Sequence, residues 1–116
     1  MKGLVIYIRR EKLDAVCSVL RQRNAAGLSV SNVEGCGRRK QQFDIEDVAA
    51  IPAREPEHLV SKLRVYTVVP DEVVETLIDE ICTAAATDRF GDGKIFIVPV
   101  EDAIRIRTRE RGEAAL

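Results

Sequence analysis

The pattern of hydrophobic positions in the first part of the chain predicts a strand, a helix and a second strand. Residues 4–8 form a short apolar run of strand length. After Glu11, apolar residues recur at intervals of three and four, which lines one face of a helix; they are Leu13, Val16, Cys17 and Leu20. Residues 27–33 form the second predicted strand.

The second half of the chain repeats this order of elements. Residues 63–69 form a β-branched run that ends at Pro70, and residues 94–98 form another apolar run before Pro99. The helical spacing recurs between them, at Val74, Leu77, Ile78, Ile81, Cys82 and Ala85. We expect Asp71 to cap this second helix. Two strand–helix–strand units in tandem predict a ferredoxin-like α+β sandwich (βαββαβ), with four antiparallel strands and both helices on one face.

The predicted strands of the second half are apolar on both faces. Val65, Thr67 and Val69 alternate with Tyr66 and Val68. Helices that cover one face leave the other face in need of cover, because soluble monomers rarely expose large apolar patches. This pattern predicts assembly with further copies of the chain.

A long polar segment separates the two halves. It extends from Arg38 to about Ser61, with two prolines, few apolar residues and no clear period. A loop this long is usually functional or disordered, and so little apolar surface predicts mobility in the absence of a partner. Beyond the last strand we expect a helical turn at residues 101–103, an extended piece at 104–108 and a frayed tail at 109–116.

Length and composition limit the class of protein. A chain of 116 residues can form one domain whose core needs no disulfide or metal. Its net charge of -1 gives no overall electrostatic field that would attract the protein to nucleic acid or to a membrane. No apolar run reaches the length of a membrane span, no signal peptide precedes the first strand, and three cysteines match no metal-binding spacing. We therefore expect a cytoplasmic protein with reduced thiols, no metal site, no nucleic-acid partner and no membrane insertion.

Three segments combine glycine with basic charge: residues 35–40 (GCGRRK), 87–94 (TDRFGDGK) and 105–107 (RIR). Glycine lets backbone N–H groups approach an anion, and lysine and arginine neutralise phosphate oxygens. The alternation in the third segment predicts two guanidinium groups on one face of an extended piece. Each segment also has an ordinary explanation, as a turn or a solvated strand face, and GDGK lacks the spacing of a Walker P-loop.

Four segments together resemble the PII signal-transduction family. TDRFGDGKIF at 87–96 resembles the family's nucleotide-gripping loop, and IRIRT at 104–108 resembles its C-terminal arginine pair. GCGR at 35–38 resembles the start of its long loop, and KLDAV at 12–16 resembles its first helix. The resemblance implies a regulator rather than an enzyme, assembled as a homotrimer with an ATP or ADP site in each cleft between subunits.

The resemblance also implies a role for individual residues. Lys62 would face the γ-phosphate or an effector carboxylate, and Arg105 and Arg107 would reach the phosphates from the adjacent subunit. The phosphates would otherwise be held by Gly91, Asp92, Gly93 and Lys94, with Gly37 and Arg38 behind them. The adenine would be framed by Gly27, Leu28, Ser29 and Val68.

Departures from the family pattern lie mainly in the long loop. It contains no tyrosine for uridylylation. Arg39 stands where most members carry a glutamine that helps to hold the magnesium ion between ATP and 2-oxoglutarate, and a guanidinium group has no lone pair for a metal. We expect Arg39 and Lys40 to face the effector or target. The implied protein binds ATP, ADP or AMP and regulates a transporter or metabolic enzyme, without the usual 2-oxoglutarate sensing.

Several alternatives stay open at this point. The chain could be a usual nitrogen regulator that senses 2-oxoglutarate, or a carboxysome-type relative linked to inorganic carbon. An acylphosphatase-type enzyme would need a positioned asparagine, for which Asn24 and Asn32 are the candidates. An RNA-binding ferredoxin-like domain would display stacking aromatics, but aromatic residues make up only 4% of the chain.

Overall fold

The computed structural model describes residues 1–25, 27–35 and 59–116. The strands are β1 (Lys2–Ile8), β2 (Leu28–Gly35), β3 (Val60–Val69) and β4 (Gly93–Pro99), and the helices are α1 (Leu13–Gln22) and α3 (Val74–Ala85). Short 3-10 helices occupy Arg10–Lys12, Asp71–Val73 and Gly112–Ala115. Predictions for the long loop between residues 38 and 58, including Arg38, Arg39 and Lys40, lie outside the described residues, as does Gly37.

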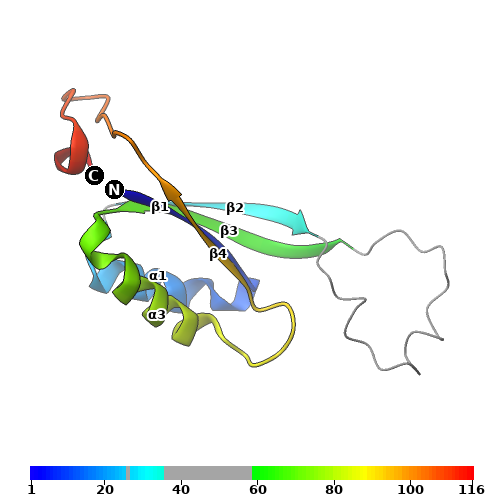
Figure 1. Ribbon diagram of the computed structural model, residues 1–116. Coiled ribbons are helices and arrows are strands. Elements are labelled where there is room, and N and C mark those ends of the chain that lie inside the picture. Colours follow the sequence, from blue (N-terminus) through cyan, green and yellow to red (C-terminus); the bar gives the residue numbers. More distant parts are fainter. Residues whose placement is uncertain (26, 36–58) are drawn as a thin grey trace, which may run out of the picture.

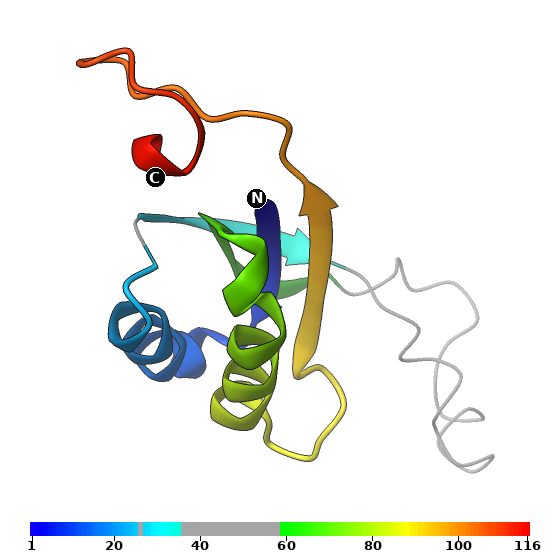
Figure 2. The same cartoon turned by 60° about the vertical axis from the view of Figure 1, so that its left-hand side comes forward.

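The four strands form one antiparallel sheet in the order β2-β3-β1-β4. Both helices pack against the same face of this sheet (Figures 1 and 2). The order of elements along the chain confirms the predicted ferredoxin-like βαββαβ sandwich.

The core lies between this sheet face and the helices. Alternate residues of β1 and β3 are buried, because successive side chains of a strand point to opposite faces. The apolar faces of α1 and α3 cover them, as the helical spacing predicts. The side chains that are completely buried include Leu4, Ile6, Val65, Val16, Leu20 and Leu77.

The opposite sheet face has no helix over it and is partly apolar. Phe96 and Val98 are 51% and 36% exposed, and the Phe96 ring packs edge-on against Tyr7 at 6.0 Å between centroids. A side chain at Gly3 would lie 2.8 Å from the Val98 methyl group and about as near to Tyr66. The apolar second face therefore forms as the strand pattern predicts, and Gly3 leaves room for Tyr66 on it.

Three local predictions around β2, β3 and α3 are wrong. Asp71 does not cap α3; it belongs to the preceding 3-10 helix, and its carboxylate lies 3.0 Å from the Met1 amino group. β3 begins at Val60, before the predicted start at residue 63, and β2 extends to Gly35, beyond the predicted end at residue 33. The two strands pair as far as Gly35 and Val60 because backbone hydrogen bonds continue where the side chains no longer need burial.

The predictions for the C-terminal segment are also wrong. Residues 101–103 are not helical, and residues 106–108 form a turn instead of an extended piece. The tail is not frayed, because Ile104 pairs with Arg111 and the Gly112 N–H donates to the Ala103 carbonyl at 3.0 Å. Arg109 adopts a positive φ of 63° just after the turn, at the point where the chain reverses. Local spacing does not reveal such a reversal.

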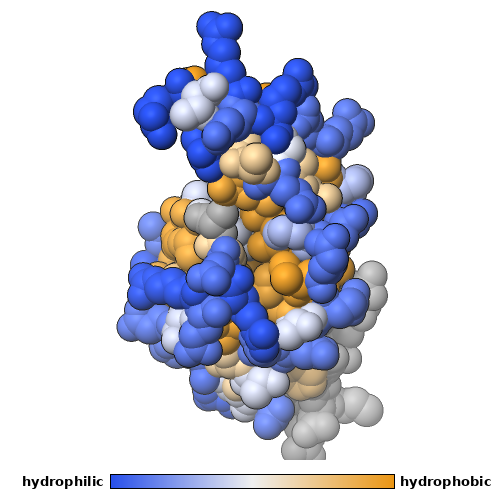
Figure 3. Space-filling view, turned by 90° about the vertical axis from the view of Figure 1, so that its left-hand side faces the viewer, coloured by the Kyte–Doolittle hydropathy of each residue, from blue (hydrophilic) through white to orange (hydrophobic). Residues whose placement is uncertain are grey.

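Hydrophobic side chains also show on the side of the molecule that carries the chain ends (Figure 3), between the hydrophilic C-terminal segment and the helices. Within the residues that the structure describes, no helix has the length and apolar content to cross a bilayer.

Replacing Leu77 with alanine should lower the free energy of unfolding by about 2–5 kcal/mol, because the side chain is fully buried and alanine leaves a cavity. Urea unfolding at a fixed chain concentration measures this loss. Ile106→Ala removes the same number of carbon atoms from a side chain that is 95% exposed, and its effect should stay within about 0.5 kcal/mol. Equal losses in the two variants would contradict the core described above.

Candidate anion-binding loop and its opposite half-site

The loop between α3 and β4 is organised around the Asp92 carboxylate. One oxygen accepts from the Thr87 N–H at 2.7 Å, and the other accepts from the Thr87 hydroxyl and from Arg9 Nε at 3.1 Å. The Thr87 hydroxyl and N–H, aided by Arg9, hold the pKa of the Asp92 carboxyl well below its ordinary range. Both oxygens of Asp92 therefore accept hydrogen bonds from Thr87 and Arg9, and these bonds hold the loop in shape.

Two glycines allow the sharp path of this loop. Gly91 and Gly93 have φ values of 91° and 115°, which side chains rarely adopt. At Gly93 a Cβ atom would also overlap the carbonyl oxygen of Tyr7 on the neighbouring strand. The close approach of β4 to β1 at this point requires glycine.

Two cations hold the outer side of the loop. Arg9 Nη2 donates to the Phe90 carbonyl at 2.5 Å, and Lys62 Nζ donates to the Gly91 carbonyl. A Cβ atom at Gly91 would lie 3.4 Å from Arg9 Nη2 and 3.6 Å from Lys62 Nζ. The backbone of Gly91 is thus flanked by an arginine and a lysine that come from other strand ends.

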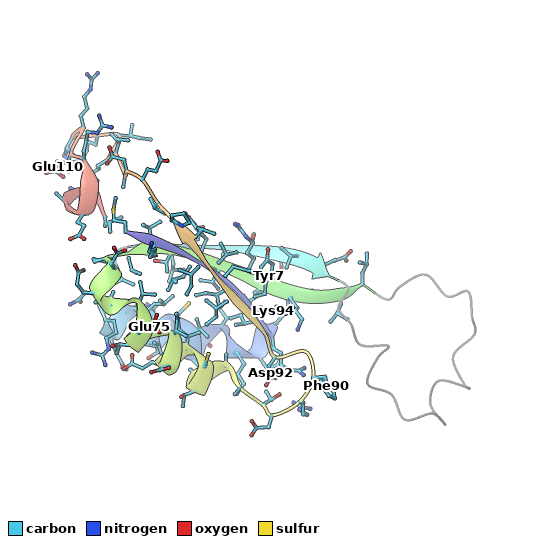
Figure 4. All side chains as sticks on the ribbon, in the orientation of Figure 1. Tyr7, Glu75, Phe90, Asp92, Lys94 and Glu110 are labelled. Carbon is cyan, nitrogen blue, oxygen red and sulfur yellow. The ribbon has the colours of Figure 1, made fainter. Side chains whose placement is uncertain are left out.

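Lys94 follows this loop on β4. It pairs in register with Tyr7, on the face without helices, and its side chain is exposed. Figure 4 shows Phe90, Asp92 and Lys94 at this end of the sheet. The loop thus gathers Lys62, Lys94 and Arg9 around a glycine-rich backbone, an arrangement suited to an anion.

The residues predicted to frame the base lie at the other end of the sheet. The Gly27 carbonyl accepts from the Thr67 hydroxyl at 2.6 Å, and Ser29 lies opposite Tyr66. Val68 lies opposite Gly3 on the adjacent strand. Val68 lies six positions after Lys62 along β3, which corresponds to about 20 Å at about 3.3 Å per residue. One chain therefore does not bring the two groups together.

The two C-terminal arginines do not share a strand face. Arg105 forms an ion pair with Glu110, and its Nη2 donates to the main-chain oxygens of Ala114 at 3.0 Å and Leu116 at 3.1 Å. Arg107 lies in the turn and is exposed. The predicted alternation fails because the Arg109 N–H donates to the Arg105 carbonyl at 2.7 Å and closes the turn.

Sequence inspection missed two residues that matter here. Arg9 belongs to no glycine-rich motif, and it contacts Asp92 only because β1 and β4 are neighbours in the sheet. Glu110 lies in the tail that we expected to be frayed. Its opposite charge five residues after Arg105 was a usable signal for a turn, because the ion pair closes over that turn.

A cavity of about 190 Å³ lies between α3 and strands β1 and β4. Its lining is mostly apolar, and it includes Ile6, Ile81, Ala85 and Ile95. The exposed free thiol of Cys82 also lines it, whereas Cys17 is buried in the core. The lining also includes Asp92, Gly93 and Lys94, so the cavity borders the loop before β4.

The chain is thus a small ferredoxin-like domain with a basic, glycine-rich loop at one end of its sheet. The chain belongs to the family described as "Nitrogen regulatory protein P-II", whose model matches residues 1–110. Members of this family are signal-transduction regulators and not enzymes, so the acylphosphatase-type and RNA-binding alternatives are set aside.

Individual relatives agree over the whole length of the chain. The nitrogen regulatory protein P-II of Cereibacter sphaeroides is 41% identical over 116 residues, and that of Nostoc punctiforme is 42% identical over 119 residues, with complete coverage of both chains in each case. The crystal structure of Arabidopsis thaliana PII bound to citrate matches with a TM-score of 0.78 and 33% identity. That match covers 99% of this chain and 91% of the plant chain.

Asp92→Asn should destabilise the protein at pH 7, because the amide NH2 group replaces an oxygen that accepts at least one hydrogen bond and so sets N–H donors against a donor. The folded-state pKa of Asp92 is lowered, so its contribution is complete above the ordinary pKa of about 3.9 and is lost as the pH falls below it. The stability difference between wild type and variant should therefore narrow from pH 7 to pH 3, as measured by urea unfolding.

Asp88→Asn is the matched control for this experiment. It removes the same charge from the same loop, and asparagine tolerates the positive φ of 59° at this position. Asp88 makes no hydrogen bond or ion pair with any residue that the structure describes. Parallel stability curves for wild type and Asp92→Asn across this pH range would contradict the role given to Asp92.

Proposed function

We propose that this protein is a homotrimeric PII signal transducer that binds an adenine nucleotide in each cleft between subunits. One observation supports this above the others. In one chain, the residues proposed to bind the phosphates and the residues proposed to frame the adenine lie at opposite ends of the sheet, about 20 Å apart by strand length. A nucleotide can contact both sets of residues only if the loop end of one chain lies beside the adenine-framing end of another chain.

In this proposal the phosphates bind at the loop end of one subunit. Backbone N–H groups of Gly91 and Gly93 and the ammonium groups of Lys62 and Lys94 would hold them, while Asp92 keeps the loop in shape. Charge-assisted hydrogen bonds of this kind are the strong ones. The related plant protein has citrate bound, a small polyanion, which supports an anionic ligand for the family.

The adjacent subunit would supply the other half of the site. Gly27, Leu28, Ser29 and Val68 would frame the adenine, and Arg105 and Arg107 would reach the phosphates. The partly exposed apolar face around Phe96 and Val98 supports the trimer, because another chain would remove that surface from water. A transporter or metabolic enzyme would then be regulated through the segment between β2 and β3, an assignment that rests on the sequence.

Lys94→Ala and Arg107→Ala should each weaken ADP binding about ten- to a hundred-fold, because each removes a charge-assisted contact of about 1.5–3 kcal/mol. Calorimetry measures the affinity. Trimers that contain subunits of both variants then test whether each site uses residues of two neighbouring subunits. If Lys94 and Arg107 of neighbouring subunits meet in one cleft, every mixed trimer regains one intact cleft.

The mixed-trimer experiment has two outcomes that contradict the proposal. A site built within one chain would regain no tight binding on mixing, and a monomer by light scattering would leave no cleft at all. Glu75→Ala, on the outer face of α3, serves as the control for each measurement, and both its ADP affinity and its assembly should match those of wild type.

Titration of 2-oxoglutarate into protein saturated with Mg-ATP should give no micromolar binding. Magnesium requires near-octahedral oxygen ligation, and Arg39 offers a cation where the family usually offers an amide oxygen. Arg39→Gln should create the binding. Micromolar binding by the wild type would contradict this prediction, and the unchanged Lys62 would then account for the effector carboxylate.

A further inference from the structure

The C-terminal segment folds on itself beyond β4. Ile104 pairs with Arg111, and the Arg105 N–H donates to the Glu110 carbonyl at 2.9 Å. A second ion pair joins Asp102 to Arg111, whose Nε lies 2.8 Å from the carboxylate. This segment, residues 102–116, projects past the end of the sheet and away from the helices (Figures 1 and 2). We call it the C-terminal hairpin.

The hairpin occupies the guanidinium group of Arg105. Nη1 donates to the Glu110 carboxylate, and Nη2 donates to the main-chain oxygens of Ala114 and Leu116 at 3.0 and 3.1 Å. Both terminal nitrogens of the fork, which would bind a phosphate, therefore already have acceptors. Glu110, which lies in the C-terminal segment (Figure 4), also places a negative charge beside the guanidinium group that would receive the phosphate.

We propose that Glu110 and the chain end beyond it act as an internal competitor for Arg105. A carboxylate takes the same planar fork of donors as a phosphate, so only one of them can occupy it. Nucleotide binding then requires the Arg105–Glu110 contact to open. This inference rests on the proposed nucleotide site and adds a regulatory contact to it.

The exposure of the contact makes such an exchange feasible. The side chains of Arg105 and Glu110 are 38% and 46% exposed, and ion pairs of this exposure contribute little to stability. A phosphate carries more charge than a carboxylate and can displace it. Arg107, which makes no hydrogen bond or ion pair within the described residues, stays available to attract the ligand before Arg105 is released.

The opposite role for Glu110 would be to orient Arg105 toward the phosphates. The two roles predict opposite results when its charge is removed. An orienting residue would lower the affinity when it is lost, whereas a competitor would raise it. The sign of the change therefore decides between them.

The experiment is calorimetric titration of ADP into the trimeric protein. Glu110→Gln should bind ADP about two- to five-fold more tightly than wild type, as expected for the loss of an exposed ion pair. Removal of residues 113–116, which supply the two main-chain acceptors, should tighten binding as well and leaves Glu110 in place. Unchanged or weaker binding in both variants would overturn the inference.

Two controls separate this result from other causes. Glu113→Gln removes the same charge three residues away, from a side chain with no ion pair in the described part of the chain. If this variant binds ADP as tightly as Glu110→Gln, the effect is one of general charge and the inference is overturned. In an Arg105→Met background, Glu110→Gln should change nothing. Absence of ADP binding by the wild type would instead refute the proposed function itself.

Discussion

Strand β1 lies at the centre of the domain, and its pairing with β3 and β4 is the interaction on which the other elements depend. It aligns Ile6 with Val65 on one side and with Ile95 on the other, so that one sheet face becomes continuous. Helices α1 and α3 cover that face, and the core forms between them. The other face is then left without a helix over it (Figure 1), and both sheet ends carry residues of the proposed site.

The loop before β4 is a consequence of the same pairing. Because Gly93 lies against the carbonyl of Tyr7, the chain can enter β4 beside the end of β1, where Arg9 is within reach of Asp92. The carboxylate then orders the loop by accepting from Thr87 and Arg9, and positive charge remains on the outside. Sheet pairing, backbone freedom at glycine and charge thus combine in one short segment.

The length of the sheet explains why assembly and ligand binding belong together in the proposed function. Groups at opposite ends of a strand are held apart by the strand itself, and no movement of a side chain closes that distance. A second chain is the direct way to join them. The C-terminal hairpin stands at the end where this junction would form, so a contact within it can control what the neighbouring site receives.

The sequence by itself determined the kind and order of the elements, because the spacing of apolar residues is a local property that burial on one face imposes. It also determined the family, through four segments that keep their order. Only the tertiary structure decided the role of Asp92, since its partner Arg9 is 83 residues away and is brought near by β1–β4 pairing.

The C-terminal residues show most clearly what could not be predicted from the sequence alone. Alternation of Arg105 and Arg107 predicted an extended piece, but hydrogen bonds across the turn and the charge of Glu110 reversed the chain there. The sequence likewise could not show that the proposed phosphate-binding and adenine-framing residues lie at opposite ends of the sheet, because register between strands fixes which residues share an end. Periodicity reports which face a residue occupies, whereas pairing between distant segments decides what that residue meets.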